Sequence, residues 1–307
     1  MKILVTDGIS ATAAARLREL GHEVVEQFYE IDDLDKAVKD ADAIIVRSAT
    51  KIRERTIDAA AEAGRLKLVI RAGVGIDNID HKYAESKGIA VRNTPRASSD
   101  AVAELAIAHM FCTARHIGAA NATMRNGEWN KKKYTGTELS RKKLGLIGFG
   151  RIARETARKA RALGMQIFYT NRRGDRNYSD YKWCTLEELL TTVDFVSLHI
   201  PYNKEKGAVL GKEQFDMMQD GVYIINTARG GVVDEKALLD ALNSGKVAGA
   251  GIDVFEDEPT MNIELVNHDR VSVTPHIGAS TKEAQMRIGI EIVNIINNWE
   301  DEDEQDL

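Results

Sequence analysis

Apolar and polar positions along this chain form two successive series of short apolar runs separated by amphipathic stretches. The runs are continuously apolar instead of alternating, which is typical of parallel strands covered on both faces. In the first series they lie at 2–5, 22–27, 43–46, 66–70 and 89–92, with helical periodicity between them, for example at 11–20 and 53–64. This pattern predicts an α/β fold with an open parallel sheet.

The second series begins after Pro95, with apolar runs at 143–148, 165–170, 194–200, 222–226, 247–252 and 271–274. Two such series predict two doubly wound parallel-sheet domains. Because Pro95 and Pro275 lie where the series change, we expect a domain of residues 95–275 inserted into one formed by 1–94 and 276–307. The stretch 98–125 is too apolar for an exposed helix, so the domain core or a dimer interface should bury it.

The composition of the chain argues against several classes of protein. The 307 residues contain no apolar run of about 18, and the opening MKILVTDG has the pattern of a strand, so we expect neither a membrane span nor a secretory leader. Cys112 and Cys184 lack metal-ligand spacing, which argues against a metal site or disulfide framework and favours a cytoplasmic protein. Six of the acids behind the net charge of −5 lie in Glu300–Asp306, an expected solvated tail. The remaining chain is close to neutral and does not favour nucleic-acid binding.

Residues 144–160 place Gly148, Gly150 and Ala153 where an apolar run passes into a helical stretch. In this strand–turn–helix context GxGxxA predicts a dinucleotide loop, although a glycine-rich turn without a ligand is the alternative. Gly148 permits the tight turn, and Gly150 lets the backbone approach a pyrophosphate at the helix N-terminus. We therefore expect a Rossmann-type cofactor domain at 95–275, inserted into a flavodoxin-like substrate domain.

The adenosine ribose contact is expected about 20 residues further on, where a carboxylate is usual. This chain has Asn171 there, followed by Arg172 and Arg173. Asparagine can bond a ribose hydroxyl without repelling a 2′-phosphate, and arginine offers a planar fork suited to phosphate. The sequence thus favours NADP over NAD, and the alternative is a pair of solvated arginines beside an NAD site.

Three further segments, INTARGGVVDEKAL (225–238), GIDVFEDEPT (251–260) and VTPHIGAST (273–281), resemble the D-isomer-specific 2-hydroxyacid dehydrogenases along essentially the whole chain. The resemblance implies that Arg229, Glu258 and His276 carry the reaction. It also implies cofactor contacts from Arg151, Ile152, Pro201, Thr227, Ala228, Asp253, Gly278 and Ala279. The remaining histidines, at positions 22, 81, 109, 116, 199 and 268, lack such context and are expected to be structural.

These residue types suit the oxidation of a 2-hydroxy acid. His276 can take the hydroxyl proton, because imidazole titrates near neutral pH. Glu258 can bond the other ring nitrogen and fix the tautomer, as in a carboxylate–histidine pair of a hydrolase. Arg229 can hold the substrate carboxylate. We expect hinge closure of the two domains around a cleft to exclude water from the hydride path.

The segments 45–51 and 70–81 resemble the 3-phosphoglycerate dehydrogenases of this family, which act in serine biosynthesis. Arg47 and Arg71 each end a predicted strand, so a phosphorylated hydroxy acid would use two arginines that a smaller acid leaves unpaired. Their pairing with acids such as Asp77 or Asp80 is the alternative. Further substrate contacts are expected from Ser48 and from the backbone N–H groups of Val74 and Gly75.

Other readings stay open. Asn171, Arg172 and Arg173 favour an NADPH-dependent glyoxylate or hydroxypyruvate reductase, and a corepressor-like dinucleotide sensor is the third alternative. The resemblance implies a homodimer built with the arm at 126–139, whose Lys131–Lys133 could reach a neighbouring subunit or form a solvated loop. We expect no regulatory extension of the ACT type after the predicted helix 280–299.

Overall fold

The computed structural model describes residues 1–305 and, of the side chains, those of 1–299. The acidic tail that the sequence predicts to be solvated, Glu300–Asp306, therefore falls outside the described side chains. The chain folds into two compact units. Unit 1 comprises residues 1–98 and 279–307, and unit 2 comprises 99–278. Both changeovers lie close to Pro95 and Pro275, where the sequence changes from one series to the other.

Unit 1 is a five-stranded, fully parallel sheet in the order β2-β1-β3-β4-β5. This 2-1-3-4-5 order is that of a flavodoxin-like doubly wound sheet, whose chain reverses direction across the sheet between β1 and β3. The strands are β1 (Lys2–Val5), β2 (Glu23–Glu26), β3 (Ala43–Val46), β4 (Leu68–Arg71) and β5 (Ala90–Asn93).

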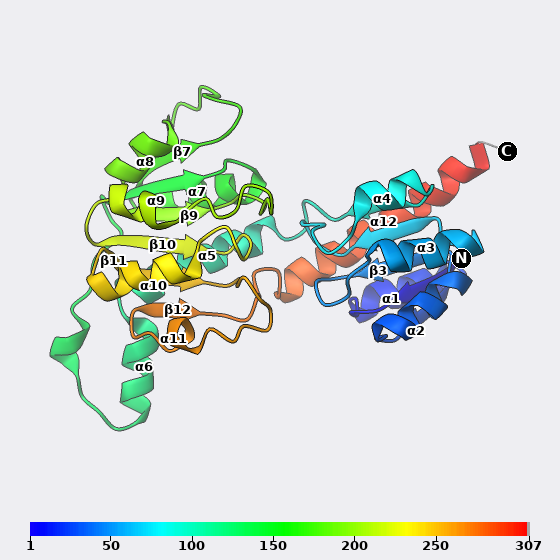
Figure 1. Ribbon diagram of the computed structural model, residues 1–307, viewed down its shortest axis with the longest axis horizontal. Helices are drawn as coiled ribbons and strands as arrows, with labels where there is room; N and C mark the ends of the chain where they lie inside the picture. The colour runs from blue at the N-terminus through cyan, green and yellow to red at the C-terminus, as the bar shows by residue number, and fades with distance from the viewer. Residues whose placement is uncertain (306–307) are drawn as a thin grey trace. The chain divides into compact units, whose positions relative to one another are not determined.

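Helices cover both faces of this sheet (Figure 1). They are α1 (Ala11–Glu19), α2 (Ile31–Ala37), the 3₁₀ turn η1 (Val38–Asp40), α3 (Glu54–Ala63), α4 (His81–Ser86) and α12 (Lys282–Gln305). On one face Ile3 and Ile45 pack with Leu17 of α1 and Ile292 of α12. The other face packs against α2, α3 and α4. Because helices cover both faces of the sheet, its strands are apolar at consecutive positions.

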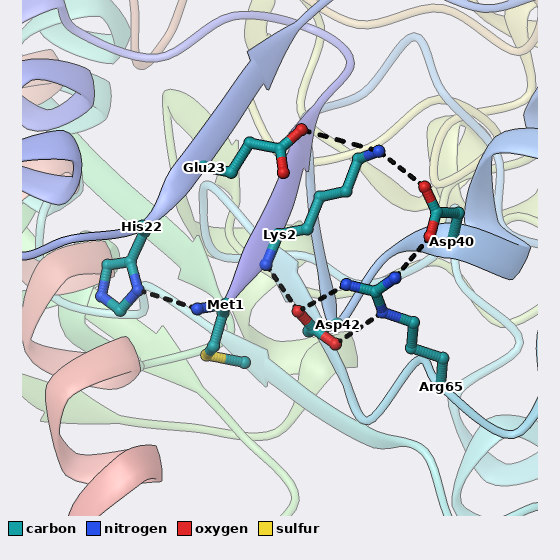
Figure 2. Close-up of polar contacts among 7 residues, drawn as sticks. All are labelled: Met1, Lys2, His22, Glu23, Asp40, Asp42 and Arg65. Atoms are coloured by element: carbon teal, nitrogen blue, oxygen red, sulfur yellow. Dashed lines mark hydrogen bonds and ion pairs between the residues drawn. The ribbon is translucent and has the colours of Figure 1, made fainter.

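The amino ends of the strands in unit 1 are joined by ion pairs (Figure 2). Lys2 lies between Asp40 and Glu23, with Nζ–O distances of 2.7 and 3.6 Å. Asp42 accepts a 2.5 Å bond from the backbone N–H of Lys2 and a 2.9 Å bond from Arg65 Nε. Ligands of doubly wound folds bind at the carboxyl ends of the strands. These charges lie at the opposite edge of the sheet.

Unit 2 is a seven-stranded parallel sheet in the order β12-β11-β10-β9-β6-β7-β8. Its chain reverses between β6 and β9, as in a Rossmann fold, so the predicted fold class is confirmed. The strands are β6 (Lys143–Ile147), β7 (Gln166–Thr170), β8 (Lys182–Trp183), β9 (Phe195–Leu198), β10 (Val222–Asn226), β11 (Val247–Ile252) and β12 (Val271–Val273). The sequence pattern does not predict β8, because two residues are too few to show a periodicity.

One face of this sheet packs against α5 (Ser99–Ala114) and α7 (Arg151–Ala162), and the other against α8 (Leu186–Thr192), α9 (Lys212–Met217) and α10 (Glu235–Ser244). The short helix α11 (Ile263–Val266) precedes β12. The apolar stretch 98–125 is interrupted at His116, whose φ of 55° ends α5. The next helix, α6 (Ile117–Arg125), has no buried residue, and the 3₁₀ turn η2 (Lys131–Tyr134) follows it. Of the two helices in the stretch 98–125, only α5 therefore contributes buried residues to the core.

Candidate functional site

The predicted dinucleotide loop lies at the point where the sheet of unit 2 changes direction. Gly148 follows β6 with a φ of +90°, and a Cβ there would lie 2.5 Å from the carbonyl oxygen of His199, which follows β9. Only glycine tolerates both the left-handed backbone and this approach. Gly148 therefore draws together the carboxyl ends of β6 and β9, between which doubly wound sheets bind their ligands.

The start of α7 fits an anionic cofactor. Gly150 is its N-cap residue, and no side chain caps the helix. A Cβ at Gly150 would meet nothing within 4 Å, so the backbone faces open space beside the first N–H groups of the helix. Arg151 and Ile152 form the first turn. The buried hydroxyl of Thr227, after β10, has no hydrogen-bond partner among the described residues, and a cofactor hydroxyl would satisfy it.

The residue directly after β7, at the predicted ribose position, is Asn171, an amide and not a carboxylate. Asn171 Oδ1 accepts a 2.7 Å bond from the backbone N–H of Arg173, which forms a short turn. Arg172 and Arg173 are exposed. Phe149, inside the glycine loop, stacks on Tyr169 of β7 with 4.1 Å between ring centroids. The loop is therefore anchored by aromatic packing, while the basic residues face solvent.

Two of the three predicted catalytic side chains are in contact. His276 Nδ1 lies 2.7 Å from Oε2 of Glu258, whose other oxygen accepts a 3.2 Å bond from the backbone N–H of Phe255. Burial raises the pKa of the Glu258 carboxyl, but bonding to His276, the Phe255 N–H group and the charge of Arg229 outweigh it, so the pKa lies below its ordinary value. The carboxylate therefore stays ionised beside the imidazole, and Nε2 of His276 makes no hydrogen bond with the described residues.

A close contact between two loops places Arg229 near this pair. Gly230 lies so close to the turn after β11 that a Cβ would be 1.7 Å from the carbonyl oxygen of Phe255. Asn226 supports the same loop, since its Nδ2 donates to the carbonyl of Arg229 and its Oδ1 accepts from the N–H of Ala228. The backbone of this loop thus brings a guanidinium to the loop that carries Glu258.

Asp253 shapes the turn that carries His276. Its buried carboxylate accepts 2.8 and 2.9 Å bonds from the backbone N–H groups of Ile277 and Gly278. Its carbonyl accepts a 2.8 Å bond from the N–H of His276, whose φ is 52°. That left-handed conformation is uncommon for a histidine and persists because the bonds on both sides fix it.

The predicted substrate residues of unit 1 lie at the carboxyl edge of its own sheet. Asp7, after β1, accepts bonds from the N–H groups of Arg47 and Thr50, and Asn78 donates to the carbonyl groups of the same two residues. This loop follows β3, and β1 and β3 flank the point of chain reversal. Arg47 is a residue of intermediate exposure, and its guanidinium makes no ion pair or hydrogen bond with the described residues; Asp80, one of its two suggested partners, instead pairs with Arg53.

The loop after β4 presents backbone donors. The carbonyl groups of Gly73 and Val74 accept bonds from Thr94 and Asn93, whereas the N–H groups of Val74 and Gly75 meet no acceptor in the described part of the chain. The Arg71 guanidinium lies over this loop, where a Cβ of Gly73 would be 1.4 Å from Nη1. The remaining predicted residues, Ser48, Pro201 and Ala279, lie in loops.

Some residues that build these loops carried no sequence signal strong enough to single them out. Asp7, Asn78 and Thr274 are common polar residues, and His109 lies within an apolar helix, where packing is the usual role. The DG pair at 7–8, directly after the first strand, is the one local cue, since it marks a loop at a strand's carboxyl end. In the described residues no group of His, Cys, Asp and Glu side chains could hold a metal ion, and no helix has the length and apolar character needed to cross a bilayer.

Comparison with known proteins adds an independent line of argument. Residues 107–278 match the family profile described as D-isomer specific 2-hydroxyacid dehydrogenase, NAD binding domain. A hydroxypyruvate reductase of Thermotoga maritima is 45% identical over 277 residues, covering 89% of this chain and 90% of the relative. A D-3-phosphoglycerate dehydrogenase of Methanocaldococcus jannaschii is 42% identical over 94% of this chain, which spans only 55% of that relative's length.

The solved structures agree. An acyclic imino acid reductase in complex with NADPH and D-Arg superposes with a TM-score of 0.90 at 28% identity, covering 98% of both chains. The matched profile spans more than half of the chain, and it includes the glycine loop and the contact between His276 and Glu258. The chain therefore belongs to the D-isomer specific 2-hydroxyacid dehydrogenases, oxidoreductases that transfer a hydride between a 2-hydroxy acid and a nicotinamide cofactor.

Proposed function

We propose that this chain oxidises a phosphorylated D-2-hydroxy acid, D-3-phosphoglycerate, to the corresponding 2-keto acid. His276, Glu258 and Arg229 are the catalytic residues of this proposal. The 2.7 Å contact between His276 and Glu258, beside the Arg229 loop, is the observation that carries it. The reaction is reversible, so the same residues serve reduction of the keto acid.

In this proposal each residue has its own task. With Nδ1–H donated to Glu258, the neutral imidazole of His276 has its lone pair on Nε2, which accepts the proton of the substrate hydroxyl. The Glu258 carboxylate then stabilises the imidazolium that forms. Arg229 binds the substrate carboxylate through its planar fork. When bound, the nicotinamide cofactor supplies the acceptor for the hydride that leaves C2 of the acid.

Arg47 supports a substrate with a second anionic group. Its guanidinium has no ion-pair or hydrogen-bond partner among the described residues, so its planar fork is available to a phosphate. It follows β3 at the point where the sheet of unit 1 reverses, which is where doubly wound folds bind ligands. We assign Arg47, with Arg71 and Ser48, to the phosphate, and the N–H groups of Val74 and Gly75 to anionic oxygen atoms.

For the cofactor we favour NADP(H). The side chain at position 171 is an amide, and the exposed guanidinium groups of Arg172 and Arg173 follow it. No carboxylate at 171 would repel a 2′-phosphate, and arginine matches phosphate geometry. The imino acid reductase with bound NADPH shows that this fold accommodates the phosphorylated cofactor.

Reduction of hydroxypyruvate or glyoxylate is the second candidate. The hydroxypyruvate reductase of Thermotoga maritima matches this chain over 90% of its own length, whereas the phosphoglycerate dehydrogenases are about twice as long as the matched region. Such a substrate lacks the phosphate that Arg47 is proposed to bind. The two candidates therefore differ in what they require of Arg47.

Substitution of Arg47 separates them. In Arg47→Gln we expect the KM for 3-phosphoglycerate to rise about tenfold or more and the KM for glycerate to change less than twofold, because only the former has the phosphate. Arg53→Gln is the matched control, since this arginine at the same sheet edge is already paired with Asp80. Equal changes for both acids, or faster turnover of hydroxypyruvate than of its phosphorylated form, would favour the reductase.

We also propose a homodimer formed by α6 together with the arm at 126–139. Ile117, Met124 and Trp129 are 47, 52 and 80% exposed on α6 and the loop after it, which is a large apolar surface for one short segment. Light scattering should give twice the mass of the chain. Trp129→Asp should shift the protein toward monomer, and an unchanged dimer would place the interface elsewhere.

A further inference from the structure

A histidine that the catalytic assignment does not use lies beneath the turn that carries His276. His109 is on α5 and is 2% exposed. Its place depends on glycine in β11, because a Cβ at Gly251 would be 2.5 Å from Cβ of His109. The missing side chain lets α5 approach the sheet closely, so that the imidazole reaches past β11 to β12 and the residue after it.

Both nitrogen atoms of this ring contact hydroxyl groups. His109 Nδ1 lies 3.0 Å from Ser272 Oγ, and Nε2 lies 3.0 Å from Thr274 Oγ1. Burial lowers the pKa of the imidazole, so the ring is neutral in the neutral pH range. A neutral imidazole donates from one nitrogen atom and accepts at the other, so the two contacts differ in direction.

The carboxylate of Asp253 sets that direction. The Thr274 hydroxyl donates its only proton to Asp253 Oδ1 over 2.6 Å, because an ionised carboxylate only accepts. Thr274 must then accept from Nε2–H of His109, and Nδ1 accepts from the hydroxyl of Ser272. The result is one continuous chain of hydrogen bonds, all pointing toward Asp253.

Asp253 in turn holds the backbone on both sides of His276, as described above. Its Oδ1 accepts from both the Thr274 hydroxyl and the Ile277 N–H, and its Oδ2 accepts from the Gly278 N–H. Rotation of this carboxylate would break two backbone bonds of a turn that keeps His276 at a φ of 52°. The hydroxyl of Thr274 opposes such a rotation, and His109 fixes the rotamer of Thr274.

We propose that His109 is a positioning residue for catalysis, acting through Thr274 and Asp253 to hold the imidazole of His276 in its left-handed turn. The proposal rests on the proposed role of His276 as the base. It distinguishes His109 from a histidine that only fills space, because its effect depends on donating to Thr274 and not on its volume.

Variants of His109 test this difference. In His109→Leu the donor is lost, and we expect kcat to fall about tenfold with the KM for the hydroxy acid changed less than twofold, because small displacements of a catalytic group reduce the rate strongly. His109→Gln can still donate an N–H to Thr274 and should recover kcat to within about threefold. Thr113→Val is the control: this hydroxyl, also buried on α5, donates only to the carbonyl groups of His109 and Met110.

A double-mutant cycle tests the route. Thr274→Val removes the hydroxyl between His109 and Asp253 while nearly preserving shape. If His109 acts through Thr274, the double variant His109→Leu/Thr274→Val should have the kcat of Thr274→Val alone. The proposal would be overturned if the loss of kcat in the double variant were the product of the losses in the two single variants. It would also be overturned if the kcat of His109→Gln were as low as that of His109→Leu. Should His109→Leu not fold, Thr274→Val and His109→Gln give the same comparison.

A second readout needs no turnover. In the protein without cofactor, the amide proton resonances of Ile277 and Gly278 report their bonds to Asp253. We expect both to move upfield in His109→Leu and Thr274→Val and to stay in place in Thr113→Val. Unmoved resonances would overturn the proposal. If the unmodified protein turned over no hydroxy acid, the proposed function would fail separately, because these resonances still decide whether His109 controls the turn.

Discussion

The imidazole of His276 and the carboxylate of Glu258 are joined by a 2.7 Å hydrogen bond across 18 residues of sequence. Glu258 lies in the loop after β11, and His276 follows β12, the next strand of the sheet. Neighbouring parallel strands deliver their following loops to the same edge, which is why the two side chains meet. The pair therefore depends on the order of the strands.

Loss of the carboxylate should impair chemistry more than binding. In Glu258→Gln we expect kcat to fall about a hundredfold, because the imidazolium loses its charge partner, while the KM for the acid changes little. Steady-state rates in both directions measure this. Asp257→Asn changes the neighbouring exposed carboxylate and should leave kcat within twofold. A Glu258→Gln variant as active as this control would remove Glu258 from the mechanism.

The open space at Gly150 should matter only to the cofactor. In Gly150→Ala the added methyl group meets no protein atom within 4 Å, so we expect the melting temperature to change by no more than a few degrees. The methyl group would occupy the approach of the pyrophosphate, so the KM for the cofactor should rise about tenfold or more. Gly118→Ala, equally open but on α6, is the control for stability and should leave that KM unchanged.

Gly230 should tolerate no side chain at all. A Cβ there would lie 1.7 Å from the carbonyl oxygen of Phe255, so Gly230→Ala must push the Arg229 loop away from the turn that carries Glu258. Overpacking of this kind costs about 1–3 kcal/mol. We expect a lower midpoint of urea unfolding together with at least a tenfold lower kcat. Full activity in the folded variant would show that this contact does not set the distance between the two loops.

Cofactor discrimination should respond to position 171. In Asn171→Asp we expect the ratio of kcat/KM for NADP to that for NAD to fall about tenfold, because a carboxylate repels the 2′-phosphate and accepts bonds from ribose hydroxyls. Arg172→Ala should lower the same ratio by lowering kcat/KM for NADP while leaving kcat/KM for NAD unchanged. An unchanged ratio in both variants would mean that the basic pair does not touch the cofactor.

The ion pairs at the amino edge of unit 1 should make stability depend on pH (Figure 2). Bonding from Arg65 and from the Lys2 N–H outweighs partial burial and lowers the pKa of Asp42. A lowered folded-state pKa adds stability that is complete above the unfolded pKa of about 3.9 and is lost as the pH falls through the folded pKa. At pH 7 we therefore expect the free energy of unfolding of Asp42→Asn to be about 1 kcal/mol lower than that of the unmodified protein, a modest loss because Asp42 is partly exposed.

Urea unfolding at a series of pH values checks this sign. The difference in free energy of unfolding between Asp42→Asn and the unmodified protein should become smaller below pH 4, where Asp42 itself takes up a proton. Asp220→Asn is the control, because its ion pair with Lys246 involves a side chain that is 90% exposed. A difference that grows toward acid would contradict the assignment.

Local patterns were sufficient for much of the fold. Continuously apolar runs predict the parallel strands, and the spacing of Gly148 and Gly150 predicts the turn between β6 and α7, because both depend on neighbouring residues. Local patterns do not predict β8, which is too short for a periodicity, or the break that His116 makes in the apolar stretch 98–125. The resemblance to a family, and not periodicity, singled out His276 and Glu258.

Only the tertiary structure decided which side chains meet. The suggested pairing of Arg47 with Asp80 does not form, because Arg53 occupies that carboxylate. His109 contacts Ser272 and Thr274 across 163 and 165 residues, a relation that no local pattern encodes. The sequence by itself determined the elements and the glycine turn, since these follow from the backbone preferences of adjacent residues. Partners distant in the chain were decided by strand order and by the room that Gly251 leaves beside α5.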